Sequence, residues 1–303
     1  MFLESFHNSK GVRVDPVLMK SWLFGYGHGP MAVLSKFNYQ ITGDPQGRKL
    51  VFLHGLLGSL ANWRRITSAF EDRYHILTYD QRGHGRSFQP QTGYGPEDYA
   101  SDLSQILEEL EWTSPFHLVG HSMGGRNALE FAARWPDRLK TLTVVDIGVE
   151  ASEEAQSGIL GLLDLVPRPF SSRKEARTFF TEVYPELIQH TQNPVALSQY
   201  FYSNMTEVET GGVDWRFSLD GVKESLRKGR ERDRWDLIEQ IQVPTLYVRG
   251  EISRDLSHEN FSKILSLNSQ IQGVEIHGAG HWVHSDQPDA FIKALNEFLT
   301  LHT

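Results

Sequence analysis

The five residues from Gly120 to Gly124 constrain the fold of this chain more than any other segment, because they place a serine between two glycines in the pattern G-x-S-x-G. The apolar residues 116–119 before them predict a buried strand, and the spacing of apolar residues over 127–132 predicts a helix after them. A serine on such a sharp strand-to-helix turn is held with its hydroxyl exposed above the sheet, as a catalytic nucleophile is.

The two glycines have a steric reason. Strand and helix cross closely at this kind of turn, so we expect a Cβ at Gly120 or Gly124 to clash and the Ser122 backbone to be strained. The turn also directs the N–H of Met123, at the beginning of the helix, towards an oxyanion formed beside the serine. The pattern alone also occurs in ordinary glycine-rich turns, and the strand and helix around it favour the catalytic interpretation.

Two other segments supply partners for the serine. Residues 272–276 predict a strand, and the glycine-flanked loop after it contains His281, the candidate general base. Far upstream, the predicted strand 49–53 leads into a loop in which the amide of Leu56 is the second candidate oxyanion donor. Backbone donors suit this task because they are fixed before charge develops. A loop histidine or a strand-end turn is ordinary by itself, whereas their combination with Ser122 favours catalysis.

The sequence leaves two candidates for the acid that orients this histidine. The strand over 244–250 leads to a loop whose usual acid position holds the uncharged Ser253, and Asp255 lies two residues further on, where we expect it on the outward side of the loop. Asp146 follows the preceding strand, 141–145, at the sheet edge where ligand-handling groups collect. We therefore favour Asp146 and keep Asp255 as the alternative acid. Asp146 as a simple cap of the next helix or turn is the competing structural interpretation.

The pattern of elements predicts an α/β fold, with a mostly parallel sheet covered by helices on both faces. After Asp146 the alternation of strands and helices stops, and mostly helical patterns are followed by a hairpin near Gly211-Gly212. We therefore expect an N-terminal extension over 1–30, an α/β core over 31–147 and 236–303, and a mainly helical cap over 148–235. The expected strands are 50–53, 74–79, 116–120, 141–147, 244–249 and 273–277, with core helices at 96–110 and 289–301 and cap helices at 153–166, 171–184 and 194–205.

The first cap helix is strongly apolar. Most of its apolar side chains are expected to pack the cap, and those that face the serine are expected to form an acyl pocket. These side chains are Ile159, Leu160, Leu162, Leu163 and Val166.

Several motifs together resemble α/β-hydrolase-fold esterases, and within them the YbfF-type esterases and their mitochondrial relatives. The motifs lie between residues 36 and 301 and read FLHGLLGSLANW, YDQRGHGRS, LVGHSMGG, VVDIGVE, WRFSLDGV, VRGEIS and GAGHWVHSDQP. HGLLGS, GHSMGG and GAGH are general to the superfamily, whereas VVDIG combined with a serine at the usual acid position is specific to the subgroup. The resemblance implies hydrolysis of carboxylic esters or thioesters, with Asp146 in the acid role.

The predicted activity is serine hydrolysis of short- to medium-chain esters or thioesters, acyl-CoA included, through an acyl-enzyme on Ser122 and without a cofactor. A carbon–carbon bond hydrolase of the same fold uses the same triad and is the alternative. A haloalkane dehalogenase or epoxide hydrolase is excluded because it needs an aspartate at this position. A non-catalytic small-molecule receptor is disfavoured because serine, histidine and acid are all present.

Composition narrows the remaining classes. A formal charge of −8 argues against a nucleic-acid-binding surface, and the absence of cysteine excludes disulfides, a thiol nucleophile and cysteine-ligated zinc. The thirteen histidines contain no H-E-x-x-H, and His281 and His284 form only a pair, so no metal is expected. No apolar run reaches the roughly 18 to 20 residues of a membrane span, and residues 1–10 lack the apolar stretch of a secretory signal. We expect a cytoplasmic protein with a small-molecule acyl substrate, and a homo-oligomer is compatible with the sequence.

One basic cluster remains. Residues 223–234 contain six Lys or Arg and three Glu or Asp. Interspersed charges on a helical pattern are typical of a solvated face. The more specific interpretation is attraction for anionic substrates such as the phosphates of acyl-CoA.

Overall fold

The computed structural model describes residues 32–151, 153–191 and 193–302. The extension expected over residues 1–30 lies outside these residues. The compact unit that begins at Val33 contains all the elements that follow.

A mostly parallel sheet forms the centre of this unit. Its strands are β1 (Tyr39–Gly43), β2 (Arg48–Leu53), β3 (Tyr74–Tyr79), β4 (Phe116–His121), β5 (Leu139–Val145), β8 (Thr245–Gly250) and β9 (Ile271–Ile276). Within the described residues these seven strands pair in the order β1-β3-β2-β4-β5-β8-β9. Only the β1–β3 pair among them is antiparallel. The carboxyl ends of all these strands except β1 therefore lie at the same edge of the sheet.

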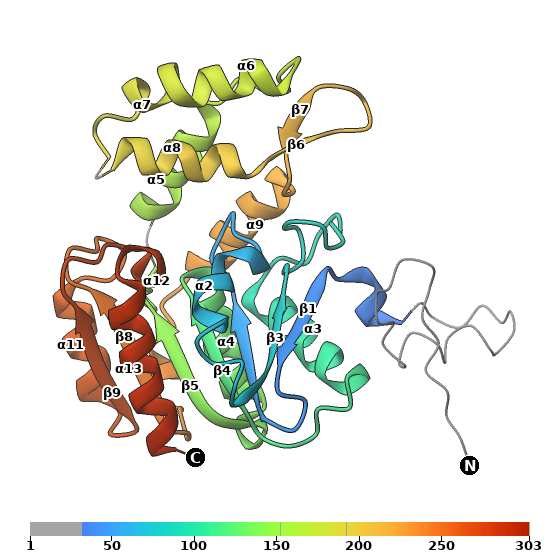
Figure 1. Cartoon of the computed structure of the whole chain (residues 1–303). Helices are drawn as coiled ribbons and strands as arrows, with labels where there is room; N and C mark the ends of the chain where they lie inside the picture. Colours follow the sequence, from blue (N-terminus) through green and yellow to red (C-terminus); the bar gives the residue numbers. More distant parts are fainter. Residues whose placement is uncertain (1–31, 152, 192, 303) are drawn as a thin grey trace, which may run out of the picture. The chain divides into compact units, whose positions relative to one another are not determined.

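Helices cover both faces of the sheet (Figure 1). The larger elements of the core are α2 (Arg64–Thr67), α3 (Pro96–Glu109), α4 (Met123–Arg134), α10 (Trp235–Glu239), α11 (His258–Leu267), α12 (Val283–Asp286) and α13 (Pro288–Leu301), and short 3-10 turns are η1 (Val33–Lys36), η2 (Leu60–Trp63) and η3 (Pro136–Arg138). Apolar side chains of α3, α4, α10 and α11 pack on one face, and those of α2, α12 and α13 on the other.

Strand β2 illustrates why the strands are apolar throughout. Leu50 and Phe52 pack into the cluster on one face of the sheet, and Val51 and Leu53 pack into the cluster on the opposite face. Successive side chains of a strand point to opposite faces, so a strand covered on both sides is a continuous apolar run rather than an alternating one.

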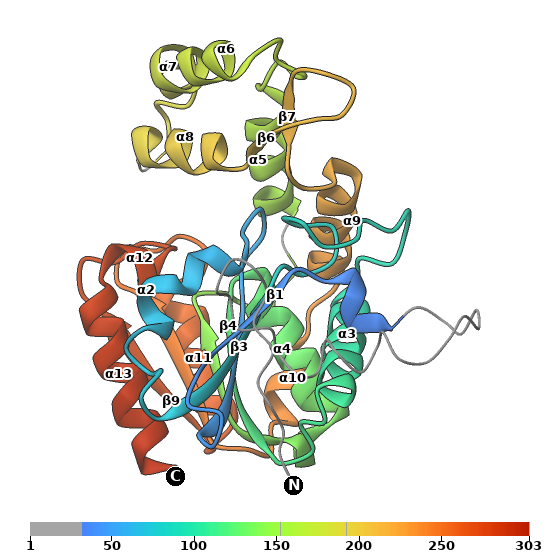
Figure 2. The same cartoon turned by 45° about the vertical axis from the view of Figure 1, so that its right-hand side comes forward.

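A mainly helical segment joins β5 to β8, and we call residues 148–235 the insertion. It contains α5 (Glu153–Asp164), α6 (Arg173–Thr178), the π-helix η4 (Phe179–Val183), α7 (Tyr184–Leu187), α8 (Pro194–Ser203), the strands β6 (Met205–Glu207) and β7 (Val213–Trp215), and α9 (Leu219–Arg230). An apolar cluster of its own, with Phe180, Tyr184, Phe201 and Trp215 fully buried or nearly so, holds these elements together. In both Figure 1 and Figure 2 the insertion lies over the edge of the sheet at which the parallel strands end.

The predicted fold class is confirmed, and the expected strands and helices are present with shifts of a few residues at their ends. The hairpin β6–β7 turns at Gly211 and Gly212, whose φ angles of 90° and 87° explain the two glycines. Strand β1 was not predicted from the sequence, because its side chains are half-buried or exposed and form no apolar run. Of the described residues, no helix is long and apolar enough to cross a membrane.

Candidate active site

The turn between β4 and α4 has the strain expected of a nucleophile turn. Ser122 has φ = 53° and ψ = −119°, which a residue with a side chain rarely adopts. A Cβ at Gly120 would lie 2.2 Å from the carbonyl oxygen of Gly124, and one at Gly124 would lie 2.5 Å from that of Leu53. These atoms belong to the backbone and cannot move aside, so the steric role predicted for both glycines is confirmed.

The structure brings Ser122, His281 and Asp146 together from the ends of three strands. His281 Nε2 lies 3.0 Å from the Ser122 Oγ, and its Nδ1 lies 2.9 Å from the Asp146 Oδ2. A carboxylate only accepts hydrogen bonds, so Nδ1 carries the proton and Nε2 is free to accept that of the serine. This tautomer is the one in which the imidazole can act as a general base towards Ser122.

Asp146 is fully buried and held in place by donors. It directly follows β5 with φ = 52°. The Gly250 N–H donates to its Oδ1 over 2.8 Å, and the Ser253 hydroxyl donates to its Oδ2. Ser253 therefore hydrogen-bonds Asp146, the candidate acid, which reaches the site from the neighbouring strand. This hydrogen bond was not predicted from the sequence, although the position of Ser253 in the loop was the signal for such a contact.

The expectation that Asp255 lies on the outward side of its loop is wrong. Its Oδ2 lies 3.4 Å from His281 Nδ1, and its Oδ1 lies 3.7 Å from the Arg230 guanidinium. The loop curves inwards because the Asp255 N–H donates to the Ser253 Oγ over 3.2 Å. Two carboxylates thus face the same imidazole nitrogen. Asp146 is the closer of the two and is the one that accepts its hydrogen bond.

Opposing effects set the charge of His281. Burial favours the neutral ring, but the charge of Asp255, together with the hydrogen bond and charge of Asp146, outweighs it and raises the pKa of His281 above its ordinary value of 6.5. Arg230 opposes this rise. The neutral base is therefore the form that predominates at alkaline pH, and protonation begins closer to neutrality than for a free histidine.

Both candidate oxyanion donors border the same cavity as Ser122. Leu56 and Met123 line it, and Met123 is the first residue of α4. The N–H groups in the first turn of a helix have no partner within the helix, so the Met123 amide is available to an oxygen bound beside the serine. The structure thus places both residues beside the same cavity as Ser122.

A buried polar network holds the backbone before Leu56. His54 Nε2 accepts from the Gln81 N–H over 2.9 Å, and its Nδ1 lies 2.8 Å from the Gly55 oxygen. The Gln81 side chain donates to the His54 oxygen and accepts from Asn127 of α4. Since α4 also carries Met123, this network couples the positions of the two candidate amides. It joins segments distant in the chain and was not predicted from the sequence.

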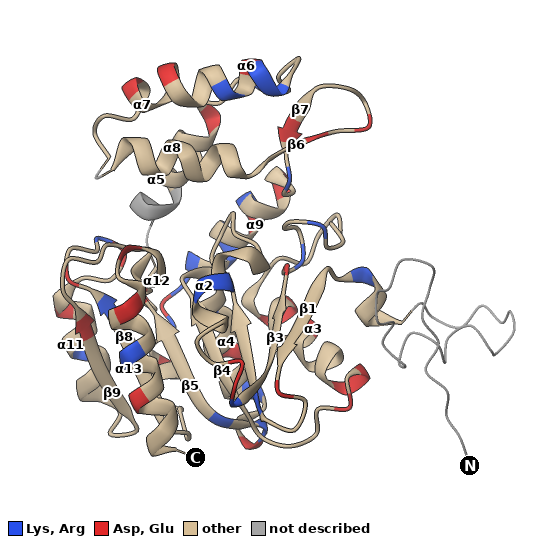
Figure 3. Ribbon diagram, viewed as in Figure 1, with Lys and Arg blue, Asp and Glu red and all other residues tan. Residues whose placement is uncertain are grey.

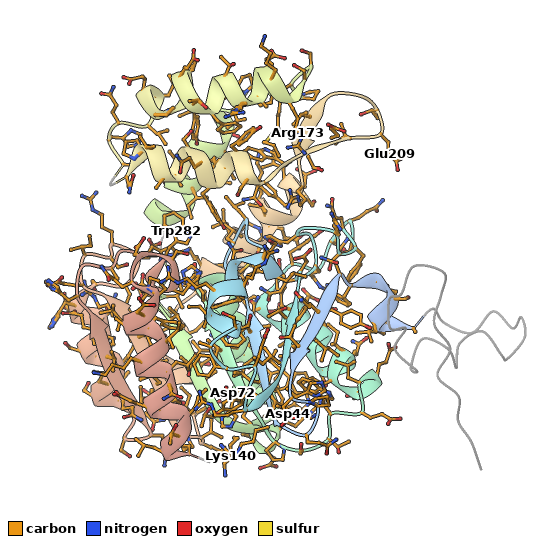
Figure 4. The ribbon with its side chains drawn as sticks, viewed as in Figure 1. Asp44, Asp72, Lys140, Arg173, Glu209 and Trp282 are labelled. Carbon is orange, nitrogen blue, oxygen red and sulfur yellow. The ribbon has the colours of Figure 1, made fainter. Side chains whose placement is uncertain are left out.

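The insertion contacts this loop directly. Tyr200 of α8 donates its hydroxyl to the Leu56 carbonyl oxygen over 2.9 Å. Its ring packs beside Trp282, the residue after His281, with ring centroids 5.3 Å apart. Figure 4 shows Trp282 on the core, directly below the helices of the insertion. Tyr200 of the insertion thus contacts both the loop that contains Leu56 and the loop that contains His281.

The cavity beside Ser122 is small, with a volume of about 40 Å³. Ile159 of the first insertion helix and Leu226 of α9 provide apolar lining, whereas Leu163 and Val166 pack inside the insertion. The same cavity is lined by Arg126 and Arg230. The apolar stretch expected to face the serine therefore contributes Ile159, and charged groups complete the lining.

Buried histidines around the triad are neutral. Burial lowers the pKa of His121 far below 6.5 and that of His284 to about 3. His121 Nε2 donates to the backbone oxygen of His281 over 2.8 Å and so fixes the histidine loop. In the described part of the chain, no group of three or more His, Cys, Asp or Glu side chains is arranged to hold a metal ion.

Comparison with known proteins places this arrangement in context. A model of the alpha/beta hydrolase fold matches residues 49–288. The chain is 31% identical over 268 residues to the sn-1-specific diacylglycerol lipase ABHD11 of Mus musculus. This alignment covers 86% of this chain and 83% of that protein. It is 26% identical over 251 residues to the esterase YbfF of Escherichia coli (strain K12), covering 82% and 92% respectively.

A solved structure shows the same similarity in three dimensions. The crystal structure of E-2-(acetamidomethylene)succinate hydrolase superimposes with a TM-score of 0.75 at 26% identity, covering 87% of this chain and 95% of that one. The similarity to esterases and other hydrolases thus includes the core and the insertion.

Proposed function

Because this chain belongs to the α/β-hydrolase family, and is a hydrolytic enzyme as its relatives are, we propose that it cleaves carboxylic esters or thioesters through an acyl-enzyme on Ser122. The observation that carries the proposal is the linear arrangement of Ser122, His281 and Asp146, with contacts of 3.0 and 2.9 Å. Relatives named as an esterase and a lipase support the choice of an acyl ester.

In the proposed first step, the Ser122 oxygen attacks the substrate carbonyl while His281 Nε2 takes the hydroxyl proton. Asp146 holds the other ring nitrogen in the required tautomer and stabilises the imidazolium. The amides of Leu56 and Met123 donate to the oxyanion of the tetrahedral intermediate. The intermediate collapses when His281 gives its proton to the leaving alcohol or thiol, which leaves the acyl group on the serine.

In the second step, His281 removes a proton from water as the water attacks the acyl-enzyme. The tetrahedral intermediate then releases the carboxylic acid and regenerates the Ser122 hydroxyl. In this proposal residues 148–235 act as a cap that closes the cavity from above and, through Tyr200, holds the oxyanion loop.

Carbon–carbon bond hydrolysis is the second candidate, and a neighbouring solved structure named as a hydrolase of a succinate derivative is consistent with a reaction other than ester cleavage. The same triad can serve both reactions, so substrates distinguish them. The experiment is release of 4-nitrophenol from 4-nitrophenyl acetate and butanoate, followed from the first turnover.

We expect a burst of 4-nitrophenol equal to the concentration of enzyme, which is the kinetic sign of an acyl-enzyme. Ser122→Ala is the control and should show no burst. Absence of ester turnover from wild-type enzyme, together with cleavage of a vinylogous 1,5-diketone, would replace the ester proposal with carbon–carbon hydrolysis.

A further inference from the structure

Arg126 is a buried cation beside the nucleophile. It lies on α4 one turn after Ser122, only 4% of it is exposed, and it lines the cavity that the serine borders. Residues i and i+4 of a helix are neighbours on the same face. The Arg126 side chain therefore borders the cavity rather than bulk solvent.

Only some of the nitrogen atoms of this guanidinium donate hydrogen bonds to the protein. Its two terminal nitrogens donate to the carbonyl oxygens of Gly229 and Glu150, and its Nε has no hydrogen-bond partner. Among the described residues, no carboxylate oxygen comes within 4.0 Å of it, although the charge of Glu150 acts on it from further away. Burial, with a further contribution from Arg230, lowers the pKa of Arg126 to about 9, so it remains charged at neutral pH.

Arg230 adds a second charge to the same cavity. It ends α9 of the insertion and is 7% exposed. Its nearest carboxylate, Asp255, lies 3.7 Å away and is shared with His281. One arginine from the core and one from the insertion thus line the same small cavity. Buried guanidinium groups are ordinarily paired with a close carboxylate, and these two are paired less closely.

Arg234 provides a contrast within the same basic segment. It is 5% exposed, but it lies 3.4 Å from Glu130, donates to the Lys228 oxygen, and does not border the cavity. Exposed members of the segment pair with their neighbours, as Arg227 does with Glu231, and Figure 3 shows both signs of charge over the outside of the molecule. The segment is therefore partly a solvated face, and Arg230 is the member that reaches the cavity.

We propose that this cavity binds an ester or thioester whose acyl group ends in a carboxylate, held by Arg126 and Arg230. A planar guanidinium matches a carboxylate in geometry and charge, and a bound carboxylate supplies the close counter-charge that Arg126 lacks within 4.0 Å. The inference rests on the proposed ester or thioester hydrolysis at Ser122 and specifies its substrate class.

Esters of short dicarboxylic acids are the first substrates to compare. Arg126 follows Ser122 by four residues, which corresponds to a rise of about 6 Å along an α-helix, and both residues line the same cavity. We therefore choose half-esters of the succinate and glutarate size for the test.

The carboxylates around this subsite neutralise it only in part. The charge of Glu150 acts on both Arg126 and Arg230, but no carboxylate oxygen of Glu150 lies within 4.0 Å of either guanidinium. Asp146 already accepts from Gly250, Ser253 and His281, and it is fully buried behind the imidazole. Asp255 lies between His281 and Arg230. Arg126 is therefore the group that a substrate carboxylate engages most directly.

The test compares esters that differ only in this carboxylate. Monoethyl succinate is compared with ethyl succinamate, a neutral analogue of the same shape, and with ethyl pentanoate, by the release of ethanol. We expect kcat/KM for monoethyl succinate to exceed that for the amide by about 100-fold or more, since a site built for a polar group rejects analogues lacking it. Carboxymethyl butanoate, with its carboxylate in the leaving group, should be a poor substrate.

Arg126→Gln should reduce the ratio between the half-ester and the amide by about 100-fold, and Arg126→Lys should retain part of it. Arg234→Gln is the matched control, since it removes a buried arginine outside the cavity and should keep the wild-type ratio. Equal kcat/KM for the charged and neutral esters in wild-type enzyme, or a preference for carboxymethyl butanoate, overturns the inference without affecting serine hydrolysis.

Binding separates this inference from the proposed function. In the Ser122→Ala protein, monoethyl succinate should bind more tightly than ethyl succinamate by calorimetry, whatever reaction the wild type performs. If wild-type enzyme cleaves none of these esters but this difference is present, the proposed function fails and the carboxylate site stands. Equal binding of the two compounds overturns the carboxylate site.

Discussion

The two carboxylates that face His281 should have separable effects, which Asp146→Asn and Asp255→Asn measure. Both substitutions preserve volume and remove charge. Asp146 lies at 2.9 Å from Nδ1 and is fully buried, whereas Asp255 lies at 3.4 Å, with 30% of its side chain exposed. Only Asp146 is expected to fix the tautomer, and both contribute to the raised pKa of the ring.

For Asp146→Asn we expect turnover to fall by about 10⁴, the loss seen when the triad aspartate of a serine protease becomes asparagine. For Asp255→Asn the effect is electrostatic. Two unit charges 3.4 Å apart interact by roughly 1 kcal/mol in a water-like dielectric, the appropriate limit for a partly exposed group that also contacts Arg230. Loss of this charge should lower the pKa of His281, because Asp255 is one of the groups that raise it.

The assay is the pH dependence of kcat/KM on one ester, from pH 5 to 9, for both variants and wild type. Asp255→Asn should move the acidic limb to lower pH and leave the alkaline plateau within about tenfold of wild type. A loss near 10⁴ in Asp255→Asn with near-normal activity in Asp146→Asn would refute the assignment of the acid.

Three further predictions follow from the same geometry. In wild-type enzyme, kcat/KM should fall as pH decreases through the raised pKa of His281, because only the neutral ring accepts the serine proton; a profile flat from pH 8 to 5 would contradict this. Gly124→Ala should destabilise the fold by about 1–3 kcal/mol, measured by thermal melting, because its Cβ meets fixed backbone atoms; an unchanged melting temperature would argue against this close approach. Tyr200→Phe should lower kcat by about tenfold, because it removes the hydrogen bond to the Leu56 carbonyl oxygen. Tyr184→Phe, which loses a comparable hydrogen bond inside the insertion, should reduce only stability. Equal kcat values for the two variants would show that Tyr200 does not position the Leu56 loop.

The sequence predicted the parts of this molecule that depend on local chemistry. The strands of the sheet are buried on both faces, so each is a continuous apolar run that stands out from its surroundings. The glycines around Ser122 are required by contacts within a single turn, which makes their role readable from spacing alone. In contrast, β1 lies at the edge of the sheet with mixed burial, and nothing in its residues distinguishes it from a loop.

The parts that the sequence did not predict depend on contacts between distant segments. Asp255 turns towards His281 because of a hydrogen bond to Ser253, and its position in the loop gives no sign of that direction. Arg126 follows the nucleophile by four residues, yet its lack of a carboxylate partner is visible only when the insertion is packed above it. Tyr200 reaches Leu56 across 144 residues of chain. No local pattern encodes such pairings.

The acyl-enzyme is the central claim, and the mass of the trapped intermediate tests it most directly. Wild-type enzyme is mixed with 4-nitrophenyl butanoate, quenched in acid during the burst, digested, and examined by mass spectrometry. The peptide that contains Ser122 should carry one butanoyl group, the label should be absent from Ser122→Ala, and Ser122→Ala turnover should fall far below a tenth of wild type. An unlabelled Ser122 peptide during rapid turnover, or a Ser122→Ala enzyme within tenfold of wild type, would contradict the proposed serine mechanism.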